Sequence, residues 1–402
     1  MISPKKLILL TFSALGLIIV AKSDRTLSLE KDEKELVRSL TSINKLAIKS
    51  FQTEHGDILD CIDINKQLAF DHPLLKNHTI QLMPTTIPKW NINNNKNSKN
   101  GDSVPFRQDD IISCPSGTVV VKRITQEDLI QSQRLKSMGS KYSRHISSEG
   151  KNFELTGFHF AVAEYRHQVF GAKVNFSIWE PEVSPTQFSS ASMLIAQGSK
   201  EQKYITKTTF QIVAQVYQWL NQNHSRLYTY WTADGFIKTG CYNILCPGFV
   251  QVSARIPLGI LFGPVSVYDG PQYEVGIRIY KDGNTGDWWL VVYDENVGYW
   301  PNSLFTKAGL GHGASLVAYG GEVYSPVKEK SPSMGSGHFP SEGYSKAAYV
   351  NNFEVVEGSV ATKPLFPVTL FSSTPNCYKA SLTGKKKVWY NAIFFGGPGK
   401  CV

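Results

Sequence analysis

The sequence predicts an all-β protein, an antiparallel two-sheet β-sandwich of the jelly-roll kind, preceded by a small α+β segment. Aromatic residues make up 12% of the chain, and 32 glycines and 20 prolines supply many turns. After about residue 153, short runs rich in aromatic and β-branched residues follow one another, and no long helical period interrupts them. Strands joined without crossover helices favour antiparallel layers over a βαβ arrangement.

The strands of the C-terminal part are predicted from their side-chain pattern. Residues 158–165 and 174–179 are rich in aromatic and β-branched residues, as strands are. Residues 273–279 alternate apolar and polar side chains, which is typical of a strand buried on one face. A turn at 281–287 contains Asp, Gly and Asn, and residues 288–293 return as the second strand of a hairpin.

The N-terminus predicts secretion. Lys5 and Lys6 precede an apolar run over residues 7–20, and small residues follow at 21–23. This arrangement is typical of a signal peptide, here residues 1–23, and the run is short for a bilayer span. A signal anchor is the alternative interpretation. No later stretch approaches 18 apolar residues, so we expect no membrane association after signal removal.

Residues 24–150 read as a separate unit ahead of a domain at 151–402. Apolar residues recur at helical spacing over residues 30–51, which predicts an amphipathic helix. Extended segments are predicted at 56–64 and 117–123, with a polar loop between them at 90–101. The polar stretch at 130–152 is expected to be an exposed linker that a processing protease could reach.

The charge pattern argues against nucleic acid as a partner. The formal net charge of +9 is spread over both halves of the chain and forms no dense basic stripe.

Six cysteines in an oxidising compartment predict three disulfides. Nearest-neighbour pairing is one of 15 possible connectivities. It joins Cys61 to Cys114, Cys241 to Cys246 and Cys377 to Cys401. A zinc site is the alternative, but the chain has no CxxC motif, and we expect neither metal nor cofactor. Glycosylation sequons begin at Asn77, Asn175 and Asn223.

Several ordered strings resemble the neprosin family of plant proteins from about residue 55 to the end. In the first part these strings are GDILDCIDI at 56–64, FDHPLLKNH at 70–78 and CPSGTV at 114–119. In the second part they are YWTADG at 230–235, TGCYNILCPGFVQ at 239–251, GYWP at 298–301, GGEV at 320–323, MGSGHF at 334–339 and GGPG at 396–399.

The resemblance implies an antiparallel β-sandwich endopeptidase that uses two glutamates and cuts proline-containing peptides after proline. It also implies a zymogen whose own prosegment inhibits it, and an extracellular setting in the cell wall or apoplast, with the vacuole as the alternative. One family glutamate corresponds to Glu322 in the GGEV string. The other position is occupied by Gln211, so the dyad of this chain is Gln–Glu, as in the fungal eqolisins.

Such a dyad has a chemical rationale. A carboxylate can take a proton from water and later return it to the leaving amine. An amide cannot act as a base, but its NH₂ group can donate a hydrogen bond to the developing oxyanion. We therefore expect Glu322 to be the base and Gln211 to position water and the oxyanion. The alternative is a non-catalytic extracellular binding module on the same fold.

Four aromatic residues are candidates for the walls of a substrate cleft, because proline rings pack well on aromatic faces. Core packing is the alternative for each of them. They are Tyr230, Trp231, Tyr299 and Trp300.

Overall fold

The computed structural model describes residues 34–90, 112–130, 132, 157–197, 208–217, 224–235, 237–358, 361–364, 368–382 and 392–401. Within these ranges, the side chains of residues 208–217 and 361–364 are not described. Residues 130 and 132 are helical, and the rest of the expected linker at 130–152 and most of the expected loop at 90–101 lie outside the described residues.

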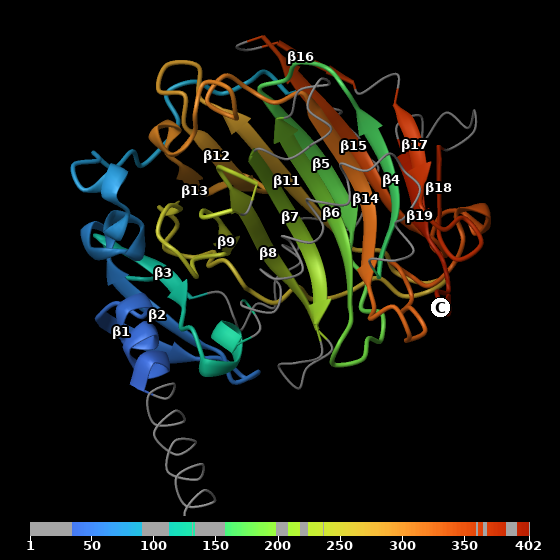
Figure 1. Ribbon diagram of the computed structural model, residues 1–402, viewed down its shortest axis with the longest axis horizontal. Coiled ribbons are helices and arrows are strands. Elements are labelled where there is room, and N and C mark those ends of the chain that lie inside the picture. Colours follow the sequence, from blue (N-terminus) through green and yellow to red (C-terminus); the bar gives the residue numbers. More distant parts are fainter. Residues whose placement is uncertain are drawn as a thin grey trace, which may run out of the picture.

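Two antiparallel sheets form the C-terminal domain (Figure 1). The first sheet has seven strands, in the spatial order β17 (Thr369–Ser372), β4 (Phe158–Tyr165), β14 (Leu316–Tyr324), β6 (Phe188–Gln197), β7 (Thr208–Tyr217), β8 (Ser225–Thr232) and β9 (Cys241–Tyr242).

The second sheet follows the order β10 (Val250–Gln251), β13 (Glu295–Trp300), β12 (Trp288–Val292), β11 (Glu274–Lys281), β5 (Gly171–Ser177), β15 (Ala348–Glu357), β19 (Ala392–Gly396) and β18 (Lys379–Leu382), and β16 (Ala361–Pro364) pairs with β15. The predicted hairpin is β11 and β12, paired from Ile277–Val292 to Lys281–Trp288. Two short 3-10 helices, η7 (Asn302–Leu304) and η8 (Pro340–Glu342), lie in the connections.

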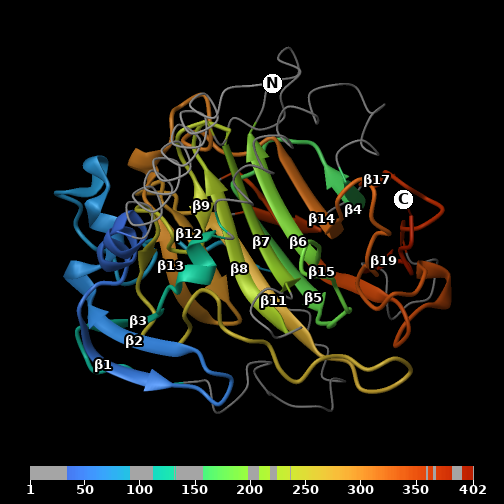
Figure 2. The same cartoon turned by 60° about the horizontal axis from the view of Figure 1, so that its bottom comes forward.

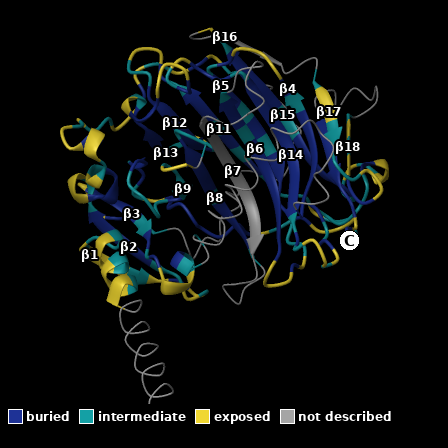
Figure 3. Cartoon of the chain, in the orientation of Figure 1, coloured by how far each residue is buried: buried dark blue, intermediate teal, exposed yellow. Residues whose placement is uncertain are grey.

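The core lies between the two sheets, as the predicted sandwich requires. Strand residues alternate between the faces of a sheet, so every second side chain enters the core. Trp288, Trp300, Tyr319 and Phe395 are fully or almost fully buried there. Figure 3 shows the strands of both sheets largely buried and the exposed residues concentrated in the connections and the N-terminal segment. The predicted all-β sandwich is confirmed.

The N-terminal segment is a small α+β unit at one end of the sandwich, on the side of β9 and β13 (Figures 1 and 2). A helix at 34–43 precedes the sheet of β1 (Ala47–Gln52), β2 (Ile58–Asp63) and β3 (Thr118–Lys122). Three 3-10 turns follow β2, namely η1 (Ile64–Lys66), η2 (Leu68–Asp71) and η3 (Pro73–Leu75).

The helix expected over residues 30–51 is wrong at its C-terminal end. It stops at residue 43, and residues 47–52 pair with β2 as strand β1. Asn44 fixes this break, because its side chain exchanges two 2.8 Å hydrogen bonds with the backbone of Ile124. A contact 80 residues away in sequence thus overrides the local helical period.

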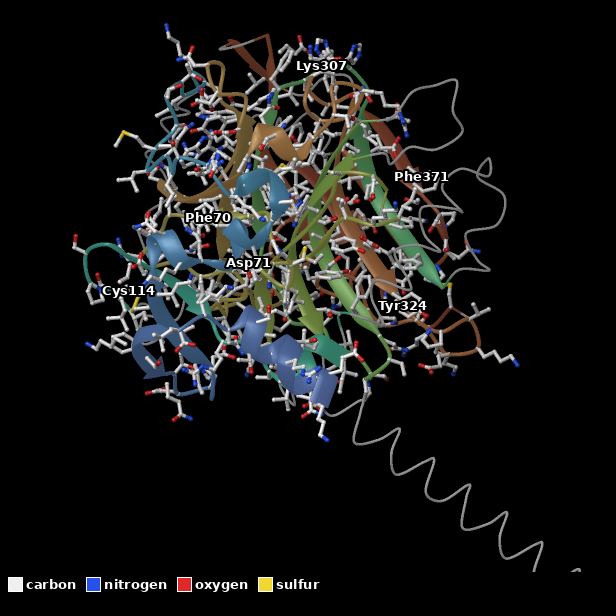
Figure 4. All side chains as sticks on the ribbon, turned by 60° about the vertical axis from the view of Figure 1, so that its left-hand side comes forward. Phe70, Asp71, Cys114, Lys307, Tyr324 and Phe371 are labelled. Carbon is white, nitrogen blue, oxygen red and sulfur yellow. A yellow bond between two sulfur atoms is a disulfide. The ribbon has the colours of Figure 1, made fainter. Side chains whose placement is uncertain are left out.

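The structure contains the three predicted disulfides, Cys61–Cys114, Cys241–Cys246 and Cys377–Cys401. The first joins β2 to the segment before β3, where the buried Cys114 is labelled in Figure 4. The second closes a short loop at β9, and the third ties the C-terminus to the loop before β18.

Candidate active site

Glu322 lies near the end of β14, on the face of the seven-stranded sheet that points away from the core. Its neighbours along the strand, Val317, Tyr319 and Val323, belong to the core between the sheets. Because side chains alternate along a strand, Glu322 belongs to the opposite, outer face. The residue is only 6% exposed. In the full-length chain this carboxyl group is therefore closed to bulk water.

The two glycines before Glu322 have steric reasons to be glycine. A Cβ on Gly320 would lie 2.3 Å from the carbonyl oxygen of Ala161, at a φ of +142° that side chains rarely adopt. A Cβ on Gly321 would lie 2.4 Å from the Met334 sulfur and 2.6 Å from the ring of Phe395. The GGE string therefore lets β14 approach β4 and pack tightly on the core, which fixes the position of Glu322.

The strand register places Gln211 on the same outer face. Glu322 is the register partner of Ser190, and Ser190 is the partner of Gln215. Gln211 lies four positions from Gln215 on β7, and an even spacing keeps both residues on one face. The side chain of Gln211 is outside the described part of the structure. The register places Gln211 opposite Leu194, and Leu194 opposite Ala318, so position 211 lies two strands across the sheet and four residues along it from Glu322.

Small residues surround Glu322 on this face, beside two aromatic groups. Around Glu322, the outer-face positions of β14 and β6 are occupied by Ala318, Gly320, Ser190 and Ser192. On one side lies a cluster that contains Phe158, Phe160, Phe188 and Tyr324. Tyr324 and Phe371, which packs against this cluster, lie well away from Phe70 and Asp71 of the N-terminal segment in Figure 4.

Tyr228, Tyr230 and Tyr242 form the aromatic group on the other side. Tyr230 stacks on Tyr242 with ring centroids 4.2 Å apart, and the register pairs Tyr230 with both Tyr242 and Gln211. Tyr228 and Tyr242 also pack against the cluster of Phe158, Phe160 and Phe188, so the two aromatic groups meet on this face beside the small residues near Glu322.

Tyr230 shares its electrostatic environment with Glu322. Burial raises the pKa of the Tyr230 hydroxyl well above its ordinary value, and the neighbouring Tyr242 and Glu322 raise it further. The phenol therefore stays protonated and keeps an O–H donor near the carboxyl group. Tyr230 is the register partner of Gln211, so the electrostatic influence of Glu322 reaches the row of strand positions that contains residue 211.

The other three aromatic candidates do not belong to this face. Trp231 and Trp300 lie in the core between the sheets, 1% and 0% exposed. Tyr299 is buried on the other sheet, where it stacks on Trp289 and contacts His78 of the N-terminal segment. The prediction that these three residues line the cleft is wrong. Neighbouring residues of a strand point to opposite faces of the sheet, and the sequence does not give the strand register that decides which face each residue joins.

Sequence reasoning missed Tyr228, Tyr242 and Arg226 on the outer face. The alternation of Arg226, Tyr228 and Tyr230 along β8 was the available signal, because period two puts all three on one side of the sheet. Arg226 is 3% exposed, and its Nη1 lies 2.5 Å from the Asp57 carboxylate of the N-terminal segment.

The N-terminal segment docks on the sandwich through buried polar contacts. Gln67 and Gln251 form a reciprocal pair, in which the Gln67 side chain accepts from the Gln251 N–H at 2.7 Å and donates to its carbonyl at 3.1 Å. Backbone hydrogen bonds run from Cys114 to Ala254 and from Val120 to Ser253. Buried groups that are paired across an interface hold it in one register.

A second docking region surrounds Asp282, at the turn after β11. Its carboxylate accepts from the hydroxyl of Thr85 at 2.7 Å, from the backbone N–H of Thr85, and from that of Thr86 at 3.2 Å. Burial alone would raise the pKa of Asp282, but these hydrogen bonds and those of the turn lower it below its ordinary value. The carboxylate thus binds the segment in its ionised form.

Other predicted sites can be placed in part. Within the described residues no group of three or more His, Cys, Asp or Glu could hold a metal ion, and no helix is long and apolar enough to cross a membrane.

Asn77 is exposed, whereas Asn175 is half-buried in a central strand and donates to Glu274 at 3.2 Å. Asn223 lies outside the described residues. Glycosylation stays a prediction.

Fold and site together define a β-sandwich protein with a buried carboxyl group on one sheet face and an N-terminal unit docked beside it. A family model described as Neprosin matches residues 185–398, and one described as Neprosin activation peptide matches residues 50–164. The chain belongs to the neprosin family. An activation peptide ahead of a neprosin domain is the organisation of a peptidase made as a zymogen.

Solved structures with a similar chain path include two of scytalido-glutamic peptidase. The one with a peptide-based transition state analog has 8% sequence identity and a TM-score of 0.34, and covers 60% of this chain and 97% of the other. The one with a transition state analog inhibitor has 10% identity and a TM-score of 0.33, and covers 59% and 97%.

Proposed function

We propose that the protein is a secreted glutamic endopeptidase that cleaves proline-containing peptides after proline, and that Glu322 and Gln211 form its catalytic dyad. The observation that carries the proposal is the buried Glu322 on the outer sheet face that also holds position 211. Titratable groups that are buried and held in place are typical of catalytic sites. The small residues beside Glu322 and the flanking aromatic rings support an extended, proline-containing ligand.

In the proposed reaction, Glu322 is the general base. It takes a proton from a water molecule that attacks the scissile carbonyl carbon, and it returns that proton to the amine nitrogen as the C–N bond breaks. The oxyanion that forms in between accepts a hydrogen bond from the amide NH₂ of Gln211. The phenol of Tyr230 is a second donor in the same environment. Water supplies both the hydroxyl group and the proton of the products.

The proposal includes latency. Glu322 is almost fully buried in the full-length chain, and we infer that release of the activation peptide opens the outer sheet face to substrate. The contacts that hold the peptide include those of Asp282 and His78, whose pKa values are both lowered in the docked state, so that acid weakens these contacts. We infer that an acidic compartment outside the cell, or the vacuole, releases the peptide after cleavage in the stretch 130–152.

The decisive experiment compares wild type with Glu322→Gln after acid treatment between about pH 3 and pH 7. A fluorogenic proline-containing peptide reports activity, and mass spectrometry reports the bond that is cut. Loss of a general base lowers kcat by roughly a hundredfold or more. Glu329→Gln, a change at a half-buried residue of the loop after β14, is the matched control and should keep full activity. Undiminished cleavage by Glu322→Gln would rule out this chemistry.

One observation favours a second candidate, a binding module without catalysis. Residue 211 is an amide, so this chain lacks the second carboxyl group that the family resemblance implies. The Gln211→Glu variant separates the two candidates. If wild type is inactive and Gln211→Glu cleaves the peptide, the natural protein is the binding module. If wild type is active, the amide suffices.

A further inference from the structure

Arg226 is a buried cation that the proposed peptidase chemistry does not use. We propose that Arg226 is a carboxylate-binding subsite for the substrate, and that Asp57 of the activation peptide fills this subsite until the peptide leaves. The inference rests on the proposed function in one respect, because it takes the outer sheet face to be the substrate site. It adds the chemical class of a recognised group, namely an acidic side chain or a terminal carboxylate.

The first support is the pair itself. Nη1 of Arg226 donates to Oδ2 of Asp57 at 2.5 Å and to the carbonyl oxygen of Gly259 at 2.9 Å. The two side chains are only 3% and 13% exposed. A guanidinium presents several donors in a fixed planar array, which suits it to carboxylate recognition. The site is therefore already shaped around one carboxylate.

The second support is the division of the pair between two units. Asp57 lies in the part matched as activation peptide, whereas Arg226 and Gly259 lie in the part matched as neprosin domain. When the peptide leaves, the carboxylate goes with it. Strand β8 and the Gly259 carbonyl stay, so the guanidinium keeps its position on the sheet face.

The third support is the position of Arg226 relative to Glu322. Register pairs connect Glu322 to Ser190, Ser190 to Gln215 and Gln215 to Arg226, so all four lie in one row across the sheet. Three strand spacings of about 4.8 Å separate the ends, roughly 14 Å. An extended peptide rises about 3.3 Å per residue, so this span corresponds to about four residues. One bound peptide can therefore reach both groups.

Tyr228 lies close both to the ion pair and to the aromatic cluster near Glu322. Burial raises the pKa of the Tyr228 hydroxyl, Arg226 opposes this rise, and Asp128 and Asp57 add to it, so Tyr228 adjoins the ion pair. The same Tyr228 packs against the aromatic cluster of Phe160 beside Glu322.

A pocket next to Arg226 shows what the activation peptide covers. The activation peptide contributes Lys122 and Asp128 to its lining, and the neprosin domain contributes Tyr228, Tyr242, Leu258 and Gly259. The Lys122 ammonium group lies 3.7 Å from the Asp57 carboxylate and 3.3 Å from the Asp128 carboxylate. Lys122 therefore holds both carboxylates of the activation peptide in place where they face the sheet. An acidic residue followed by an apolar one would fill the same space in a substrate.

The test measures binding, so it does not depend on catalysis. A recognition sequence for a specific protease is inserted between residues 131 and 150, the chain is cut, and the activation peptide is removed by gel filtration in acid. Labelled proline-containing peptides then carry one Asp at successive positions, each paired with an Asn version, and fluorescence anisotropy gives both Kd values. At one of these positions, the peptide with Asp should bind about tenfold more tightly than the matching peptide with Asn, which is the effect of one hydrogen bond to a charged group.

The variants assign this preference to Arg226. Arg226→Gln alone removes the guanidinium that binds the largely buried Asp57 and leaves it only the longer contact with Lys122, which can prevent folding. The double variant Asp57→Asn, Arg226→Gln removes both charges, and in it the Asp and Asn peptides should bind equally. Arg278→Gln, which removes an arginine paired with Asp294 on the other sheet, should keep the tenfold preference.

Each outcome has a separate meaning. Equal binding of Asp and Asn peptides by the wild type at every position, or a preference that survives in the double variant, overturns the subsite. So does an activation peptide that cannot be separated from the cut chain. A tenfold preference without any cleavage supports the subsite and contradicts the peptidase proposal. Cleavage without a preference for Asp peptides supports the peptidase proposal and overturns the subsite.

Discussion

His78 of the activation peptide lies with its Nε2 2.7 Å from the hydroxyl oxygen of Tyr299 in the neprosin domain. The same oxygen accepts the backbone N–H of Gln81 at 3.0 Å, so its own proton is available for the histidine nitrogen. A neutral imidazole can accept that proton, whereas a doubly protonated one cannot. The contact therefore favours neutral His78 and makes docking sensitive to acid.

The sign of this pH dependence follows from the pKa. Burial lowers the pKa of His78, and the nearby Asp287 carboxylate only partly offsets this effect. The docked state thus binds fewer protons than the released state. The stabilisation is complete above the ordinary histidine pKa of 6.5, and it is lost as the pH falls through the lowered pKa.

We therefore expect His78→Gln to shift the midpoint pH of peptide release downward, by about half a unit to one unit. Glutamine can accept the Tyr299 proton at any pH, so the acid-sensitive contribution disappears. Gel filtration of the cut chain at a series of pH values gives the midpoint. His338→Gln, at a histidine paired with Glu342 on another part of the surface, is the control and should release at the wild-type pH. An unchanged midpoint in His78→Gln would exclude His78 as a contributor.

Asp282→Asn should weaken docking of the activation peptide at neutral pH. The ionised carboxylate accepts from Thr85 and Thr86, and hydrogen bonds to a charged group contribute about 1.5–3 kcal/mol each. Because its pKa is lowered, this contribution is present above the ordinary value of 3.8 and is lost only below it. We expect the Kd of the released peptide to rise at least tenfold, as measured by calorimetry. Asp294→Asn, at an exposed aspartate, should leave the Kd unchanged.

Tyr230→Phe should lower kcat by about ten- to a hundredfold, with a smaller effect on KM, because it removes a hydrogen-bond donor near the developing oxyanion. The ring stack on Tyr242 is kept, so the melting temperature should change little. Tyr319→Phe removes a buried hydroxyl from the opposite face of the sheet, where it donates to the Glu354 carbonyl, and should leave kcat unchanged. Equal kcat values for Tyr230→Phe and wild type would refute a role for this donor.

Gly321→Ala should destabilise the domain by about 1–3 kcal/mol and lower activity. The added methyl group meets Met334 and Phe395 in a tightly packed core, and such overpacking shifts the backbone that carries Glu322. Urea unfolding measures the stability. Adding Met334→Ala makes room for the methyl group, so the double variant should be less destabilised than the sum of the two single changes. Additive losses would argue against this steric contact.

Much of the architecture could be predicted from local patterns. The hairpin of β11 and β12 is marked by alternating residues around a polar turn, and β2 and β3 by their apolar runs. The helix over residues 30–51 failed where Asn44 bonds to Ile124, a contact that has no local signal. Trp231 and Trp300 were misplaced for a related reason, because a strand sequence does not say which of its two faces meets the core.

The sequence alone determined the composition of an all-β chain and the GGE string around Glu322, since these depend on residues close together along the chain, and it favoured the cysteine pairing that the structure contains. Only the tertiary structure decided that Glu322 and position 211 share one outer face, and that Arg226 meets Asp57. Those relationships depend on how four strands pair and on how a separate N-terminal unit docks. Register and docking are set by the total burial of many distant side chains, which no single segment encodes.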